Sequence, residues 1–309
     1  MCGGAKRWPP GLRKDWLWMT DKTPFHLWHW LSDRFARTMI GAMLALPYRW
    51  RVPLMGALMR RIVGPLAGYR ARALDNLAMI WPDMPAARRR QIAAGALDNA
   101  GRSLIENYST RDFTARAANL PVTGPGLQAL ERATAEGRPV ILVSGHFGNY
   151  EAARAALVAR GFTIGGLYRP MRNPYFNAHY VRTMEAFGGP VFAQGRSGTT
   201  GFVRHLKTGG LLVLLFDQNA RGAQIPFLGH PAQTALSAAE LALRYGAELI
   251  PFYGIRRADG LTFDVVLEAP IAPSTPLEMT TALTRSLEAR IMAQPEQWFW
   301  VHRRWKSAG

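Results

Sequence analysis

Cysteine is almost absent from this sequence, whose 309 residues contain one, Cys2. A single thiol forms no intramolecular disulfide, which fits a protein that works in a reducing compartment such as the cytoplasm. No apolar stretch precedes Cys2, so we do not expect a lipoprotein cleavage site there.

Several catalytic motifs are missing as well. There is no Gly-x-x-x-x-Gly-Lys phosphate loop, no Cys-x-x-Cys pair and no His-Glu-x-x-His, which argues against P-loop enzymes, zinc ribbons and zinc proteases. Ser144 is not in a Gly-x-Ser-x-Gly elbow, because Leu142 and His146 occupy the glycine positions. A covalent serine hydrolase is therefore disfavoured, and we expect neither a metal nor a covalent intermediate.

Acidic residues are scarce, and 38 Lys+Arg against 21 Asp+Glu give a formal net charge of +17. A surface of this kind suits an anionic partner, such as nucleic acid, acidic lipid headgroups or an acidic carrier protein. The ten Trp favour the membrane among these, because Trp settles at the lipid–water boundary.

Long apolar runs are also lacking. Residues 1–24 are basic and aromatic without the apolar core of a signal peptide, and the run from Met39 to Pro47 is too short to cross a bilayer. We interpret residues 25–66 as helices lying in the membrane interface, anchored by Trp28 and Trp30. A single tilted span and ordinary amphipathic core helices remain alternatives.

The rest of the sequence predicts an α/β fold with a mainly parallel central sheet and helices on both faces. We divide the chain into membrane-associating N-terminal helices (1–68) and an α/β domain (69–309) with a helical lead-in (69–120). Strands and helices are expected to alternate after a composition shift near residues 121–126. The expected strands are 140–144, 162–167, 190–193, 211–216, 248–254 and 262–267, and the expected helices are 126–136, 151–160, 174–187, 198–207, 235–245 and 276–293.

The stretch from Pro139 to Glu151 organises this domain. An apolar run, Val140 to Val143, predicts a buried strand, with His146 at its exit and Glu151 at the start of the next helix. A Glu that orients the imidazole would let His146 take a proton from a hydroxyl. The alternative is a hydrogen-bonded structural His and an exposed Glu.

Polar residues follow two further strands: Tyr168-Arg169-Pro170 and Asp217-Gln218-Asn219. Ligands bind at the carboxyl ends of strands in open parallel sheets, so these clusters favour a site there. Arg169 could serve an oxyanion or a phosphate, or form a structural salt bridge. Asp217 could instead cap a helix. For Trp298 and Trp300 we expect core packing, because alternate residues of a strand share one face.

Gly145-His-Phe-Gly-Asn-Tyr-Glu151 resembles the His-x4-Glu signature of the lipid A late acyltransferases, the lauroyl/myristoyl (Kdo-dependent) family. Other segments match that family in order, over about residues 47–306: Asn76-Leu77, Trp81-Pro82-Asp83, Tyr168-Arg169-Pro170, Asn173-Pro174, Asp217-Gln218 and Pro295-Glu-Gln-Trp-Phe-Trp-Val-His-Arg-Arg-Trp-Lys306. The N-terminal segment departs from it, since relatives usually have a cleaner apolar helix.

The resemblance implies transfer of a fatty acyl chain from acyl carrier protein to a hydroxyl of a lipid A precursor at the cytoplasmic face of the inner membrane. No cofactor beyond this acyl donor and no nucleic acid would be involved. His146 would be the general base and Glu151 its orienter. The substrate would be bound by Arg169, Asn173, Arg182, Asp217, Gln218, Arg303 and Arg304.

Two other functions remain open on the sequence alone. The same chemistry could acylate another membrane glycolipid, such as a mannoside, or an aminolipid such as an ornithine lipid. A non-enzymatic basic protein that binds anionic lipid would explain the charge, although not the placement of His146 and Glu151.

Overall fold

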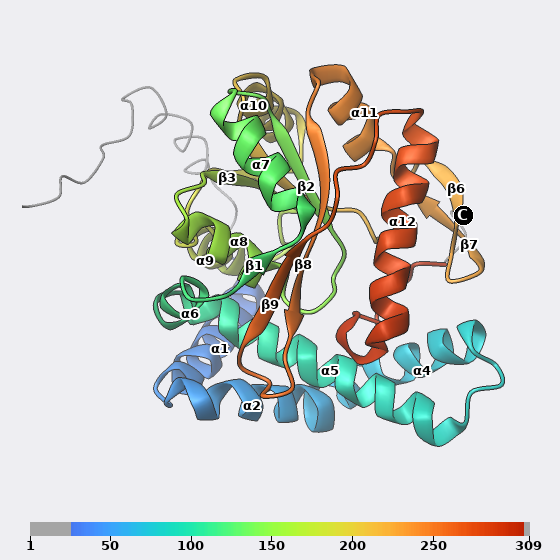
Figure 1. Cartoon of the computed structure of the whole chain (residues 1–309). Helices are drawn as coiled ribbons and strands as arrows, with labels where there is room; N and C mark the ends of the chain where they lie inside the picture. Colours follow the sequence, from blue (N-terminus) through green and yellow to red (C-terminus); the bar gives the residue numbers. More distant parts are fainter. Residues whose placement is uncertain (1–25, 306–309) are drawn as a thin grey trace, which may run out of the picture.

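A seven-stranded sheet forms the central layer of the computed structural model, which describes residues 26–305 (Figure 1). The strand order is β1-β9-β8-β2-β5-β3-β4, and the β8–β9 pair alone is antiparallel among the paired strands of this sheet. The prediction of a mainly parallel sheet is confirmed. The strands are β1 (Val122–Thr123), β2 (Val140–Ser144), β3 (Ile164–Tyr168), β4 (Val191–Ala193), β5 (Leu211–Leu215), β8 (Glu248–Arg256) and β9 (Phe263–Leu267).

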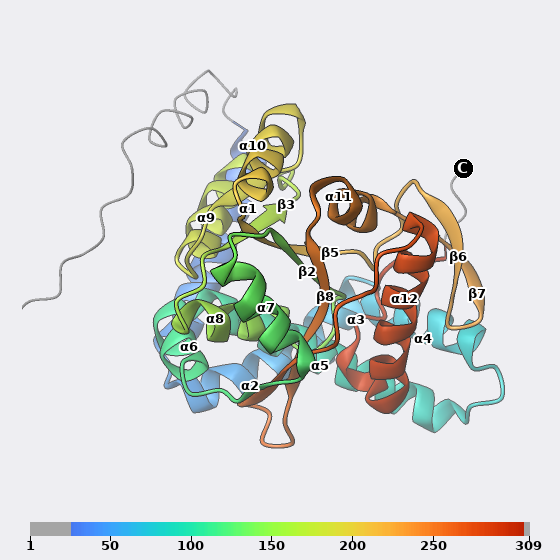
Figure 2. The same ribbon diagram turned by 45° about the horizontal axis from the view of Figure 1, so that its top comes forward.

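Strand β2 is buried on both faces, which explains its continuous apolar sequence. Val140 and Leu142 pack into one core with helices α7 (Pro125–Ala135) and α8 (Tyr150–Ala159). Ile141 and Val143 point to the opposite face, where α10 (Arg196–Lys207), α11 (Ser237–Tyr245) and α12 (Pro276–Ala293) cover the sheet. Helices therefore lie on both faces, as predicted, and Figure 2 shows α7 and α12 on opposite sides of the strands.

The helical part before the sheet lies across one end of the strands. In Figure 1 helices α2 and α5 run beneath the ends of β8 and β9. Asn99 of α5 donates a hydrogen bond to the backbone carbonyl of Gly148, just after β2. Helix α5 therefore borders the carboxyl ends of the parallel strands. These elements are α1 (Leu27–Leu44), α2 (Tyr48–Leu58), the π-helix η2 (Met59–Val63), α3 (Gly64–Leu66), α4 (Tyr69–Ile80), α5 (Ala86–Tyr108) and α6 (Thr110–Ala117).

No helix among residues 26–305 is long and apolar enough to cross a membrane. Membrane association of α1 to α3 stays a prediction. Tyr48, Val52 and Met55 of α2 are buried against Ile105 of α5 and Ala152 of α8, so this helix does contribute to the protein core. The proposed boundary at residues 68/69 remains a prediction, and the expectations for Cys2 and residues 1–24 lie outside the described residues.

The sequence did not predict the hairpin of β6 (Ala223–Phe227) and β7 (His230–Thr234). Its two-residue turn is Leu228-Gly229, both with positive φ (50° and 81°). Asn or Gly normally supplies that conformation in hairpins, so a Leu gives no turn signal. Here the Leu228 backbone N–H donates to Glu288 of α12, which helps to hold the turn.

Candidate active site

His146 lies two residues beyond the end of β2, in a loop that backbone hydrogen bonds hold from both sides. Gly148 donates a backbone hydrogen bond to Gln297 O (2.9 Å), and Asn149 donates one to Gly254 O (2.8 Å). Gly148 has φ +57°, and a Cβ there would lie 2.0 Å from the Gly254 oxygen. Only glycine fits this close approach, so the loop that presents His146 is fixed by backbone packing.

Asp217 follows β5, the strand next to β2, and it is the carboxylate that pairs with His146. The distance from His146 Nδ1 to Asp217 Oδ1 is 2.7 Å, and the His146 backbone N–H donates to Oδ2 at 2.7 Å. The Trp298 indole N–H also donates to Oδ2, at 2.9 Å. Asp217 is fully buried, whereas the His146 side chain is 24% exposed. The imidazole is therefore anchored on one side and open on the other.

Electrostatics keeps this carboxylate charged. Burial alone would raise the pKa of Asp217, but the charge of His146, the hydrogen bonds from its ring and backbone, and the nearby His302 outweigh it, so the pKa lies well below its usual value. An ionised carboxylate only accepts hydrogen bonds. Nδ1 of His146 is therefore the donor in this contact, and in a neutral ring the lone pair is on Nε2.

The predicted pairing of Glu151 with His146 is wrong. Glu151 is buried, and its Oε2 lies 3.0 Å from the Arg154 guanidinium on the next turn of α8. Arg154 in turn donates to Gly188 O at 2.6 Å, beyond the end of α9 (Pro174–Glu185). A helical first turn directs Glu151 into this buried ion pair, away from the strand exit. Asp217, which was predicted to contact substrate or to cap a helix, is the carboxylate that pairs with His146 instead.

A second buried ion pair stabilises the His146 loop. Arg256 of β8 binds Glu106 of α5 with two hydrogen bonds (2.6 and 2.8 Å). Asn149 donates to the same carboxylate (2.8 Å) while its own oxygen accepts from Glu151 N, capping α8. Such a fully bonded buried network rigidifies its surroundings, and here it ties the His146 loop to α5.

The chain after η3 (Pro295–Gln297) completes the site. Phe299 N donates to His146 O at 3.0 Å, and Trp298 and Trp300 are fully buried, which confirms the expectation of core packing. The ring of His302 lies against that of His146, with centroids 4.4 Å apart. The sequence analysis assigned no site role to Trp298 or His302, although both belong to a quoted motif.

Four predicted substrate-binding residues are exposed. Arg169 directly follows β3, a neighbour of β5, Gln218 follows Asp217, and Arg303 follows His302. Arg182 lies on α9. Among the ion pairs of residues 26–305, none involves Arg169, Arg182 or Arg303. These guanidiniums are available to a ligand, and their contact with substrate stays a prediction.

Two other predicted substrate-binding residues are hydrogen-bonded within the fold. Asn173 caps α9: its oxygen accepts from Tyr175 N and Phe176 N, while its amide donates to His29 O of α1. Arg304 is fully buried, and its guanidinium donates to the backbone oxygens of Gln218 and Gln233 and to the Thr234 hydroxyl. Both side chains hold the fold together near the site, and their contact with substrate stays a prediction.

Donor atoms of His146, Asp217 and His302 lie within 4.8 Å of one another, a spacing that a metal ion could bridge. Both oxygens of Asp217, however, already accept hydrogen bonds from His146 and Trp298, and a metal would have to displace them. The contacts favour a proton-transfer pair over a metal centre, and the absence of a metal stays a prediction.

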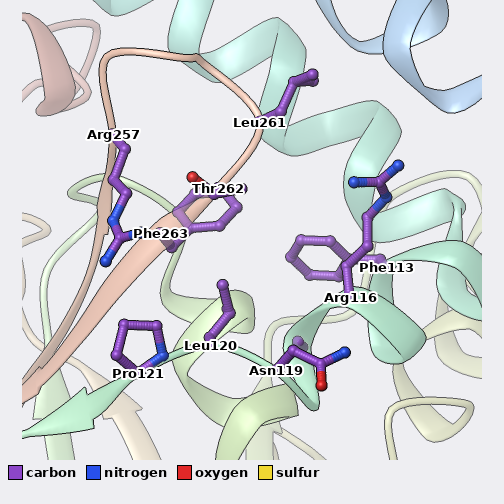
Figure 3. A pocket seen from close by; sticks show the side chains of 10 residues that line it. Phe113, Arg116, Asn119, Leu120, Pro121, Arg257, Leu261, Thr262 and Phe263 are labelled. Carbon is purple, nitrogen blue, oxygen red and sulfur yellow. The ribbon is translucent and has the colours of Figure 1, made fainter.

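A cavity of about 260 Å³ lies elsewhere, between α6 and the loop that joins β8 to β9 (Figure 3). Phe113, Phe263, Arg116 and Arg257 are among the residues that line it. Arg257 is paired with Asp264, and no predicted site residue lines this cavity. It is therefore separate from the His146 site.

Comparison with known proteins identifies similar chains. Residues 22–307 match the family described as bacterial lipid A biosynthesis acyltransferase. A lipid A biosynthesis acyltransferase of Haemophilus influenzae is 25% identical over 288 residues, 89% of each chain. The lipid A biosynthesis lauroyltransferase of Escherichia coli is 27% identical, covering 75% of this chain and 77% of its own. A phosphatidylinositol mannoside acyltransferase of Mycobacterium tuberculosis is 24% identical, covering 74% and 75%.

Proposed function

From the premise that this chain belongs to the bacterial lipid A biosynthesis acyltransferase family, we propose that it transfers a fatty acyl chain from acyl carrier protein to a hydroxyl of a lipid A precursor. The observation that carries the proposal is the His146–Asp217 pair, 2.7 Å apart at the carboxyl ends of β2 and β5. The pair supplies a base that is oriented on one nitrogen and open on the other, as attack by a hydroxyl requires.

In the proposed reaction, Nε2 of His146 takes the proton of the acceptor hydroxyl as its oxygen attacks the thioester carbonyl. The C–O bond forms, the tetrahedral intermediate collapses, and the C–S bond breaks. The imidazolium then returns the proton to the departing thiolate of the carrier. Asp217 stabilises the imidazolium throughout, because its buried negative charge lies against Nδ1–H. The reaction needs no cofactor beyond the acyl donor.

The exposed guanidiniums of Arg169, Arg182 and Arg303 would bind anionic groups of the substrates. A planar guanidinium binds phosphate with two parallel hydrogen bonds. Arg169 follows β3, and Arg303 follows His302. Alternatively, one of them would stabilise the oxyanion of the tetrahedral intermediate.

We place the site at the cytoplasmic face of the inner membrane, with α1 and α2 lying in the interface. Trp28 and Phe35 are 81% and 74% exposed, and Trp50 is 58% exposed. Guanidiniums lie over two of the exposed indoles, Arg34 over Trp30 and Arg49 over Trp50. Exposed aromatic rings beside cations match the boundary between lipid tails and anionic headgroups.

Replacing Trp28 and Phe35 together by serine is expected to weaken binding to phosphatidylglycerol-containing vesicles by about tenfold or more, because two large apolar side chains no longer enter the interface. Vesicle co-sedimentation of the purified protein measures this. Leu277→Ser on α12, where the side chain is 47% exposed, is the matched control and should bind like the parent. Equal binding by the double variant would contradict the placement of α1.

The substrate is tested by incubating the protein with acyl carrier protein loaded with fatty acids of different lengths and with defined acceptors, followed by mass spectrometry. We expect a tetra-acylated lipid A precursor to gain one acyl chain. The relative that acts on phosphatidylinositol mannoside favours one competing acceptor, so a mannoside and an ornithine lipid are included. Acylation of one of these alone would replace the lipid A assignment, and vesicle binding without any transfer would indicate a lipid-binding protein.

A further inference from the structure

A second imidazole packs directly against the proposed base. The ring of His302 meets the ring of His146 at 75°, and it also meets Phe299 edge to face, with centroids 4.9 Å apart. Its backbone is fixed as well: His302 N donates to Phe299 O, and His302 O accepts from Asn76 of α4 at 3.0 Å. The position of this ring is therefore set by α4 and the C-terminal segment together.

The Nε2 atom of His302 is buried and has no hydrogen-bond partner within residues 26–305. An unpartnered buried nitrogen costs stability, and a phenyl ring would fill similar space without that cost. Buried polar atoms are satisfied in the great majority of cases, so an exception beside reacting groups points to a role in the chemistry.

His302 is uncharged at neutral pH. Burial, followed by the charge of His146, lowers the pKa of His302 to about 4; Arg304 acts in the same direction and Asp217 opposes it. The ionisable groups that act on the His302 ring are thus His146 after β2, Asp217 after β5 and Arg304 of the C-terminal segment. A neutral imidazole has one protonated nitrogen and one with a lone pair, so it adds no charge that would repel an imidazolium.

We propose that His302 is a positioning residue for the base: it fixes the His146 ring and places an unprotonated nitrogen beside the imidazolium that forms during transfer. A nitrogen of His302 lies within 4.8 Å of a ligand atom of His146 and of Asp217. In a buried environment of low dielectric, a nearby lone pair stabilises developing positive charge more than it would in water. This role presupposes the acyl transfer proposed above.

His302→Phe tests this role, because the phenyl ring keeps the packing and removes the nitrogens. We expect kcat to fall about tenfold, with KM for carrier and acceptor unchanged and the melting temperature equal or higher. His302→Gln, which stays uncharged and keeps an acceptor atom, should recover most of the lost rate. The parent and His146→Ala are measured beside them with acyl carrier protein and the tetra-acylated lipid A precursor.

The outcomes separate the two proposals. If the parent transfers acyl chains, His146→Ala does not, and His302→Phe turns over as fast as the parent, the role of His302 is refuted and the proposed function stands. A fall in kcat that is not recovered by His302→Gln, or that comes with a lower melting temperature, would make His302 a packing residue only. If the parent itself transfers no acyl chain to any acceptor, the proposed function fails first.

Discussion

Asp217→Asn is expected to lower the kcat of acyl transfer by about 10²–10⁴-fold, with KM nearly unchanged. An amide in place of the carboxylate removes the charge that stabilises the His146 imidazolium and no longer requires the proton to be on Nδ1. Nε2 then loses part of its capacity to accept the hydroxyl proton. Steady-state kinetics with a saturating acyl donor measure the change, and circular dichroism establishes that the variant is folded.

Glu151→Gln is the matched control, because it removes the charge of another buried carboxylate near the same loop. We expect this variant to lose stability, by about 3–5 kcal/mol, because the Arg154 guanidinium is left buried without its charge partner. Per folded molecule its kcat should stay close to that of the parent. A selective loss of kcat in Glu151→Gln, with Asp217→Asn fully active, would restore Glu151 as the orienting carboxylate.

The second large effect is expected for His146→Gln, which should also slow transfer by about 10²–10⁴-fold, because no other group takes its place as the base. Glutamine is similar in length and polar, so the Asp217 carboxylate keeps a donor nearby and the fold should survive. The measurement is single-turnover transfer from radiolabelled acyl carrier protein, which separates chemistry from product release.

A histidine outside the site provides the control for that variant. His230 belongs to the β6–β7 hairpin, and His230→Gln should transfer at the rate of the parent. If His146→Gln transfers as fast as His230→Gln, proton removal by His146 is not part of the reaction, and the mechanism must be abandoned.

The sheet was predictable because its signals are local. The apolar run Val140 to Val143 and the similar run at Leu211 to Leu215 are recognisable as buried strands without knowledge of their neighbours. The pairing of β2 with β5 is not local, since these strands lie about 70 residues apart and are joined in register by the folded sheet. Placing both polar clusters at strand ends was correct, but the order of the strands decided which of them touch.

The partner of His146 was assigned wrongly for the same reason. Glu151 is five residues from His146, and proximity in sequence made it the obvious carboxylate. A first helical turn carries it toward Arg154, whereas Asp217 arrives from the neighbouring strand. Spacing along a chain does not fix direction where a strand turns into a helix.

For the two predicted substrate-binding residues that are bonded within the fold, only one had a readable signal in the sequence. Asn173 followed by Pro174 is a frequent helix start, with the Asn as N-cap and the Pro in the first turn, which could have identified a capping role. Arg304 gave no such signal, because nothing in an Arg-Arg pair tells which guanidinium is buried.

A double-mutant cycle on His146 and Asp217 tests the central claim most directly, namely that these two side chains act as one catalytic unit. Single-turnover rates are measured for the parent, His146→Gln, Asp217→Asn and the double variant. If Asp217 acts through His146, the double variant should be no slower than His146→Gln alone. Losses that multiply, so that the double variant falls below His146→Gln by the full factor seen for Asp217→Asn, would show that the two residues act independently and would contradict the account.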